Sequence, residues 1–426
     1  MINNILKRFL FIFLLFMYIY GPPFAFFSFS SDKLIHLFFI ISLFFYPDKY
    51  ARLFKYPIFT LTIVVQIIVS VYTLILYLFT PTEYNYILHN LLLLTEVLIS
   101  SMFFVVLYLE WFQKPNADTY NFLLYSIIII TTLQSLISIV GFVNPKLNIY
   151  INNGLLFYQK SYNFGINYRG FGMSDDYFFT MPVVQGIGFV CCLYFVFQEK
   201  YLYLLPLPFL LLSISFNARI GFTPIVIFVL SSVIFFFKKG EIKIRAVLVL
   251  IALTGFFILY FNPDVFWKSK LNQGVSFGYS FFDVTSKFLF SNKNDETANY
   301  SVLREMIFFP DKNLMLFGTG ESIFYSNHKN SDVGYINQIF YGGITYMILQ
   351  FSVLFIAFYQ TMKSLKFNFD NLKIKVFIVG AFLTFLICNI KGYFFLVKPG
   401  LRLVFLIFFI VYYTSVNMKT HNERKI

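Results

Sequence analysis

The sequence predicts an all-α, polytopic integral membrane protein with about 12 transmembrane helices and a large outer loop before the tenth. The first observation is composition: 58% of the 426 residues are hydrophobic, 12% are charged, and the mean hydropathy is +0.72. The second is that apolar segments of about 15–25 residues recur, which is the length a helix needs to cross a bilayer. The third is one polar segment of mixed charge, Asn262 to Gly334. Apolar runs of this length lack the alternation of a membrane β-barrel.

The expected spans follow one another from the N-terminus with short loops between them. Lys7 and Arg8 precede the first apolar run, and no small-residue cleavage site follows it, so we expect a retained helix rather than a cleaved signal peptide. The segments predicted to cross the membrane are Ile5–Tyr20, Lys33–Tyr46, Pro57–Phe79, Ile87–Leu109, Asn121–Phe142, Tyr177–Phe197, Tyr201–Phe216, Ile220–Phe237, Ala246–Phe261, Tyr335–Tyr359, Val376–Ile390 and Leu401–Val416.

These spans divide the chain into three parts. Residues 1–261 hold helices one to nine with a smaller outer loop at 143–176, residues 262–334 form the large loop, and residues 335–426 hold helices ten to twelve and a tail. Lys and Arg are concentrated in the short loops on the side of both termini, and the positive-inside rule makes that side cytoplasmic. The loop at 262–334 is then expected outside.

Composition also excludes several classes of function. The net charge of +13 does not indicate nucleic-acid binding, because the cations sit mainly in short loops where they act as topology signals. Cys191, Cys192 and Cys388 all lie in apolar segments, so they predict no disulfide framework. No histidine–carboxylate cluster has zinc-ligand spacing, and no Walker loop is present. We therefore expect no metal and no cofactor.

Several cations on the expected outer face are not explained by topology. Each has an ordinary interpretation, as a cation reaching the lipid headgroups or as half of a surface ion pair. Together they favour a diphosphate ligand, because guanidinium groups bind phosphate oxygens in pairs. The candidates are Arg169, Arg219, Arg304, Lys391, Lys398 and Arg402.

Carboxylates near or within the spans are the other candidates. His89 and Glu96 lie seven residues apart on one face of the fourth span, where an acid is either functional or a protonated group bonded to a neighbouring helix. Asp175 and Asp176 are explained by a helix N-terminus. Asp332 comes just before the tenth span, so it is either a desolvated base for a hydroxyl group or the N-cap of that helix.

The sequence resembles the O-antigen polymerases (Wzy type), which are related to the O-antigen ligases. The residues that carry the resemblance are Arg219, Arg304, Leu316-Phe317-Gly318-Thr319-Gly320-Glu321, Ser331-Asp332-Val333-Gly334-Tyr335, Gly342-Gly343 and Asn389-Ile390-Lys391-Gly392. In the ligase-like loop motif, Asp332 falls where ligases have a histidine, while Gly343 and Tyr346 fit the motif's spacing. The likeness covers most of the chain by layout and 218–403 by motif.

The resemblance implies a membrane glycosyltransferase in the bacterial inner membrane, acting on its periplasmic face. It would transfer a growing glycan from undecaprenyl diphosphate onto the next lipid-linked repeat unit, with no nucleotide, and a chain-length regulator as a possible protein partner. The implied catalytic residues are Asp332, Arg304 and Arg219. The implied substrate-binding residues are Arg169, Lys391, Lys398, Arg402, Tyr335, His328 and Glu321. A lipid-linked oligosaccharide flippase or other transporter, and a ligase, are the alternatives.

Overall fold

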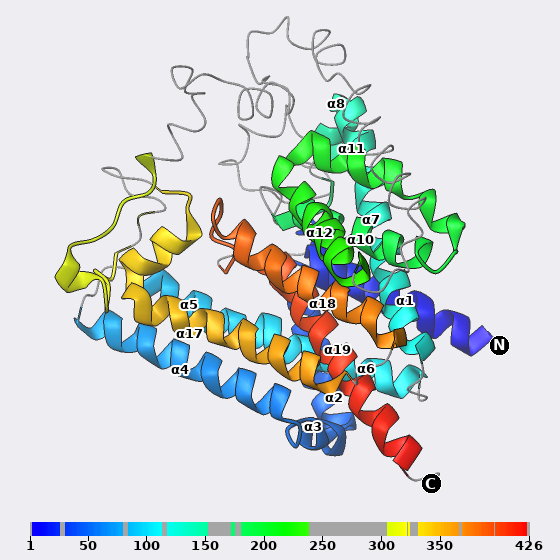
Figure 1. The fold of residues 1–426 in the computed structure, drawn as a ribbon, viewed down its shortest axis with the longest axis horizontal. Coiled ribbons are helices and arrows are strands. Elements are labelled where there is room, and N and C mark those ends of the chain that lie inside the picture. Colours follow the sequence, from blue (N-terminus) through cyan, green and yellow to red (C-terminus); the bar gives the residue numbers. More distant parts are fainter. Residues whose placement is uncertain are drawn as a thin grey trace, which may run out of the picture. The chain divides into compact units, whose positions relative to one another are not determined.

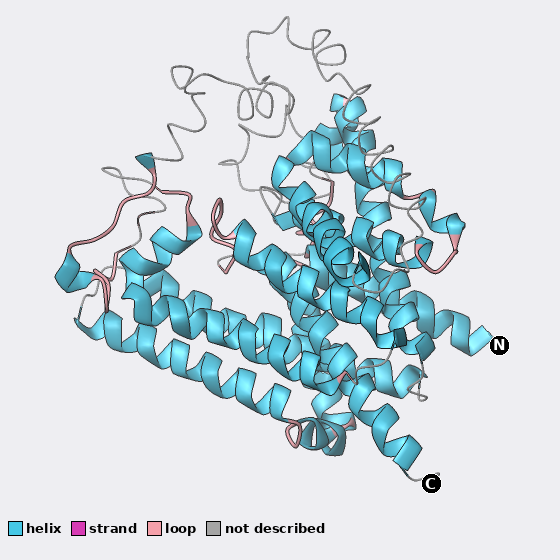
Figure 2. Cartoon of the chain, viewed as in Figure 1, coloured by secondary structure: helices cyan, strands magenta, loops and turns pink. Residues whose placement is uncertain are grey.

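The protein is helical throughout the part of the chain that a computed structural model describes (Figure 2). That part is the whole chain except residues 1, 26–29, 80–83, 113–116, 152–171, 175–179, 238–304, 322, 324–330, 366–368, 396 and 424–426. No strand occurs among these residues, so the predicted all-α class is confirmed for them.

Helices lie within the expected spans, apart from 246–261, which is outside the described residues; those at 47–53 and 145–149 were not expected, and the number of twelve spans stays a prediction. The α-helices are α1 (Ile2–Tyr20), α2 (Asp32–Phe45), α3 (Pro47–Leu53), α4 (Pro57–Phe79), α5 (Tyr84–Leu92), α6 (Ser100–Phe112), α7 (Ala117–Val143), α8 (Pro145–Ile149), α10 (Thr180–Val196), α11 (Leu207–Asn217), α12 (Thr223–Phe237), α17 (Gly334–Ser364), α18 (Phe369–Cys388) and α19 (Lys398–Glu423). A π-helix, η1 (Leu93–Ile99), joins α5 to α6, and 3-10 turns lie at η4 (Tyr201–Leu204), η5 (Arg219–Phe222) and η6 (Lys312–Leu314).

Membrane character follows from five helical segments that are long and apolar enough to cross a bilayer. The bent pair α2 and α3, at 102°, adds a sixth if it counts as one broken span. Shorter apolar helices lie at Thr180–Val196, Tyr201–Asn217 and Ile220–Ser232. The five long segments are Pro57–Phe79, Tyr86–Phe112, Tyr120–Val143, Gly334–Ser364 and Lys398–Asn417.

The described helices belong almost entirely to one compact unit, residues 1–231 and 309–426, while residues 232–308 form a second. Within the first unit α19 is the central helix. In its membrane-length apolar stretch 89% of the residues are buried, and it packs against α1, α6 and α17 (Figure 1). In α4 only 39% is buried. Its exposed side chains include Leu61, Val64, Ile67, Ile68 and Val71, which form the apolar face expected of a helix in contact with lipid.

One expected span is interrupted. The segment predicted as a continuous helix at 335–359 forms α17, which lies beside α4 (Figure 1) but has non-helical backbone at Gly342 and Gly343. Gly343 has a φ of +70°, a conformation that residues with a Cβ rarely adopt. Glycine adopts it readily, so the break forms at the glycine pair. The sequence signal was Gly-Gly in the interior of an apolar run.

Candidate functional site

Segments expected on one side of the membrane meet at one end of the first unit. The backbone N–H of Gly334 at the start of α17 donates to the carbonyl of Asn389 at the end of α18, at 2.9 Å. His89 on α5 contacts the carbonyl of Phe395, with Nε2 and O 2.6 Å apart. The α18–α19 turn is therefore fixed against the beginnings of both α17 and α5.

Asp332 lies at this end and does not cap α17. The N-cap position belongs to Val333, whose side chain makes no capping bond, and the Val333 N–H donates to Ser331 Oγ at 3.2 Å. The expected capping role of Asp332 is therefore wrong. The aspartate had seemed to be the cap because it is the nearest capping residue type, but the helix begins one residue too late for it.

The Asp332 carboxylate is half-buried and near a cation. Burial raises its pKa above the ordinary value, and the charge of Lys391 opposes that shift. In the part of the chain that the structure describes, Asp332 makes no hydrogen bond and no ion pair. Lys391 is exposed on the turn after α18. The arrangement is a half-buried carboxylate whose lone pairs have no partner among the described residues.

The backbone on both sides of Asp332 is held by a buried amide. Asn337 Nδ2 donates to the carbonyl of Ser331 at 2.6 Å and to the carbonyl of Val333 at 3.0 Å. The contact between Gly334 and Asn389 is close enough to exclude a side chain, because a Cβ on Gly334 would collide with Asn389 Oδ1 and lie 2.6 Å from the carbonyl of Gly392. Sequence analysis did not single out Asn337.

The remaining predicted site residues have varied surroundings. Tyr335 donates its hydroxyl to the carbonyl of Leu386 at 2.7 Å and stacks on Phe351, so it fastens α17 to α18. Glu321 is exposed. Arg219 is the first residue of η5. Three other predicted site residues lie outside the described part of the chain: Arg169, Arg304 and His328.

Arg402 lies in a buried ionic cluster rather than on a surface. Its guanidinium donates to Asp32 on α2, to Glu96 on η1 at 3.2 Å and to the carbonyl of Tyr18 at 2.9 Å. Lys398, one turn earlier on α19, pairs with Glu96. Arg402 is 2% exposed, whereas the Lys398 side chain is 26% exposed. We call these four charged residues the ionic cluster.

The ionic cluster answers the question that Glu96 raised. Its carboxylate pairs with Lys398 and accepts a hydrogen bond from Arg402 at 3.2 Å, so its partners are two cations on the neighbouring helix α19. Asp32 was the missed partner. Its signal was an acid at the start of an apolar segment on the same expected side as Arg402, since charges within spans pair with one another.

A neutral network continues inward from Asn389. Asn389 Nδ2 donates to Gln338 at 2.9 Å, Gln338 to Gln350 at 2.7 Å, and Gln350 to Tyr346 at 2.5 Å and Asn90 at 3.3 Å. These side chains are buried. Interhelical hydrogen bonds of this kind hold spans together where no water is present. The network therefore ties α5, α17 and α18 together below the turn.

The break in α17 is closed by the segment that follows η6. The carbonyls of Phe340 and Tyr341 accept from the N–H groups of Thr319 and Gly320, at 2.7 and 2.9 Å. The N–H of Ile344 in turn donates to Met315. The exchange satisfies backbone groups that the break frees, as buried backbone requires. It also anchors the end of the 309–321 segment to α17.

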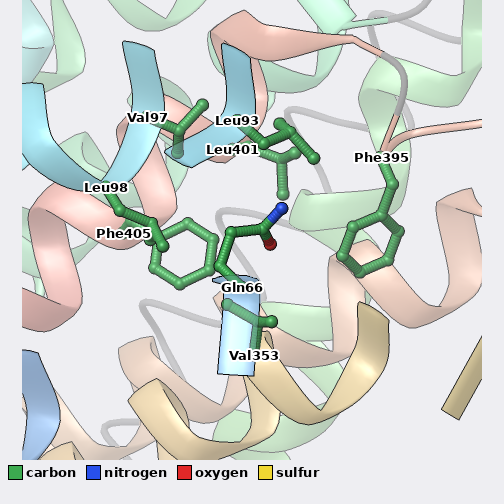
Figure 3. Close-up of a pocket in the computed structure, with 8 residues that line it drawn as sticks. All are labelled: Gln66, Leu93, Val97, Leu98, Val353, Phe395, Leu401 and Phe405. Carbon is green, nitrogen blue, oxygen red and sulfur yellow. The ribbon is translucent and has the colours of Figure 1, made fainter. Parts of the chain in front are cut away.

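A small cavity lies away from Asp332. It measures about 10 Å³, room for roughly one water molecule, and eight residues line it (Figure 3). Gln66 is the one polar side chain among them, and its Nε2 donates to the carbonyl of Asn90 at 3.0 Å. The other lining residues are Leu93, Val97, Leu98, Val353, Phe395, Leu401 and Phe405. The cavity is too small and too apolar to hold a sugar.

Comparison with protein-family models gives no match to this chain, and comparison with curated proteins gives none either.

Proposed function

We propose that the protein polymerises undecaprenyl-diphosphate-linked oligosaccharide repeat units into an O-antigen or similar surface polysaccharide, on the periplasmic face of the inner membrane. The observation that carries the proposal is the half-buried Asp332 carboxylate beside Lys391, a carboxylate with no hydrogen bond or ion pair to the residues that the structure describes. A base that removes a proton from a sugar hydroxyl needs a free lone pair and a pKa above that of a fully hydrated carboxylate. Asp332 meets both requirements at the end of a predicted span.

The proposed reaction exchanges one glycosidic bond for another. Asp332 accepts the proton of the acceptor hydroxyl as its oxygen forms the bond to the anomeric carbon of the donor glycan. The bond from that carbon to undecaprenyl diphosphate breaks, and the electron pair leaves on the diphosphate. Cations stabilise the charge that develops there, which is the electrostatic part of catalysis.

The cations proposed for the diphosphate fall into two groups. Lys391 is exposed near Asp332 and is the described cation best able to reach a ligand there. Arg169, Arg219 and Arg304 complete this group on the strength of the resemblance. Arg402 is assigned a supporting role, because its guanidinium is committed to Asp32 and Glu96. Lys398 belongs with Arg402, because both pair with Glu96.

The test uses purified protein and purified lipid-linked repeat units. The wild type is expected to give a ladder of products, and Asp332→Asn to slow single-turnover extension by about 10²–10⁴-fold. Asp311→Asn is the matched control, an exposed aspartate in the same stretch of chain. A rate for Asp332→Asn within a few-fold of wild type would remove Asp332 as the base.

A transporter of lipid-linked oligosaccharides is the second candidate, favoured by the ionic cluster. Charges inside spans commonly mark ion or proton pathways, and Asp32, Glu96, Lys398 and Arg402 bring four together. The two candidates differ in product. A polymerase lengthens the glycan in detergent solution, whereas a flippase leaves the length unchanged and alters only which leaflet of a vesicle holds the lipid.

A further inference from the structure

We infer that Asn337 is a positioning residue for Asp332, an inference that rests on the proposed function. Its side-chain amide bonds the carbonyls of Ser331 and Val333, the two residues that flank Asp332 in sequence. One buried group therefore fixes the peptide units on both sides of the carboxylate. We call Ser331, Asp332, Val333 and Gly334, held in this way, the aspartate frame.

The aspartate frame is also joined to the turn that carries Lys391. Gly334 N–H donates to the carbonyl of Asn389, two residues before Lys391. Asn389 Oδ1 accepts from Phe394 N–H at 3.2 Å across the same turn. Asn337 on one side and Asn389 on the other thus set the position of the carboxylate relative to the cation. This geometry does not depend on any titration.

The chemistry of the contact requires an amide at position 337. Both partners are carbonyl oxygens, so the group between them must donate twice, and an Asn NH₂ has two hydrogens. Asn337 Oδ1 has no partner among the described residues, which leaves donation as the side chain's role. A carboxylate would face the carbonyls with acceptors only, and an apolar side chain would donate nothing.

Loss of the amide need not unfold α17. The backbone N–H of Asn337 donates to the Val333 carbonyl at 3.0 Å, and that bond survives any substitution other than proline. What is lost is the hold on Ser331 and half of the hold on Val333. Asp332 would then occupy several positions instead of one, and a displacement of about 1 Å at a reacting group can cost about 10²-fold in rate.

The experiment compares Asn337→Leu with Thr361→Val in the purified protein, using lipid-linked repeat units. Thr361 is buried on the same helix and donates to Ala357 and Phe408, so its loss matches the structural cost far from Asp332. We expect Asn337→Leu to lower single-turnover extension by about 10–10²-fold with KM unchanged. The acid limb of its rate–pH profile should move to lower pH as Asp332 becomes better hydrated. Thr361→Val should leave both unchanged.

A labelling measurement keeps the inference separate from the proposed function. Asp332→Cys is treated with a water-soluble maleimide, alone and combined with Asn337→Leu; the native cysteines are buried. We expect the second substitution to raise the labelling rate several-fold. An unchanged labelling rate overturns the aspartate frame whatever the activity. A raised labelling rate with no polymer from the wild type leaves the frame in place and overturns the polymerase proposal alone.

Discussion

Removing the guanidinium of Arg402 is the most informative perturbation of this protein. Arg402→Met keeps the length and apolar character of the side-chain stem but leaves Asp32 and Glu96 without the cation that bridges them. Both carboxylates are buried, with side chains 3% and 6% exposed. Lys398 still pairs with Glu96, so Asp32 is the carboxylate that loses its ion pair.

The magnitude follows from the burial of these groups. Breaking a buried ion pair by removing one partner costs about 3–5 kcal/mol, because the remaining charge is uncompensated. Arg402 has two such partners and a third bond to the Tyr18 carbonyl, which places the cost at the upper end, and Lys398 offsets part of it. For a chain of 426 residues this corresponds to roughly 3–6 °C in apparent Tm.

The assay is thermal unfolding in detergent at one fixed scan rate, since membrane proteins commonly unfold irreversibly. Arg402→Lys should lose less than Arg402→Met, because it keeps a charge but not the planar fork that serves several acceptors. A fall of less than about 1 °C for Arg402→Met would refute the reasoning. It would mean that the carboxylates find other partners or water.

A triple variant separates the structural role from ligand binding. Arg402→Met with Asp32→Asn and Glu96→Gln removes the three buried charges and leaves only Lys398, whose side chain is 26% exposed; replacing the buried members of an ion cluster together is often neutral. If Arg402 only holds the helices together, the triple variant should fold and extend glycan. A stable triple variant without extension would instead support the diphosphate role predicted from sequence.

Three further predictions concern the break, the topology and pH. Gly343→Ala should lower the folded yield, since φ there is +70° and a Cβ would collide with backbone atoms. Gly380→Ala is the control and should not lower the yield, because its Cβ would lie 3.8 Å from the nearest atom. The amount of detergent-soluble monomer measures both. Alkaline phosphatase fusions should be active at Lys293 and inactive at Lys239, and the reverse pattern would overturn the orientation. Burial raises the pKa of Asp332 in the folded protein. The stability that this carboxyl contributes is therefore complete below its unfolded-state pKa and is lost as the pH rises through its folded-state pKa. Asp332→Asn should accordingly stabilise the protein most at high pH, as measured by thermal scans.

Hydropathy was enough to locate the long helices, but not the short α3 and α8. Segments such as 57–79 match because a span needs a long apolar run, and that property is local in sequence. The break at Gly342 and the π-helix around Glu96 could not be predicted, because each depends on partners distant in the chain. A glycine pair permits a break. The backbone N–H groups of Thr319 and Gly320 stabilise it, because they donate hydrogen bonds to carbonyls of α17.

The candidate site was predicted in part for the same reason. Asp332 stood out because it is a charge at a span boundary, a property of sequence alone. Its capping role was wrong, because a shift of one residue in where a helix begins decides the cap. Arg402 was expected to be accessible, because nothing local in the sequence connects it to Asp32. Asn337 resembles any other polar residue in a span until its two carbonyl partners are known.

The separation of the ionic cluster along the chain has a consequence for biosynthesis. Asp32 and Arg402 are 370 residues apart, and Glu96 and Arg402 are 306 apart. At about 5–20 residues per second, roughly 20–75 s pass between synthesis of the first acid and of its cation. During that interval the acids of α2 and η1 lack the arginine that bonds them in the folded protein, so each must remain at the membrane surface or be shielded by the insertion machinery. Synthesis of α19 would then supply the cation that pairs with these acids. A ribosome stalled before Arg402 would leave a nascent chain with unpaired acids, which quality-control proteases can recognise.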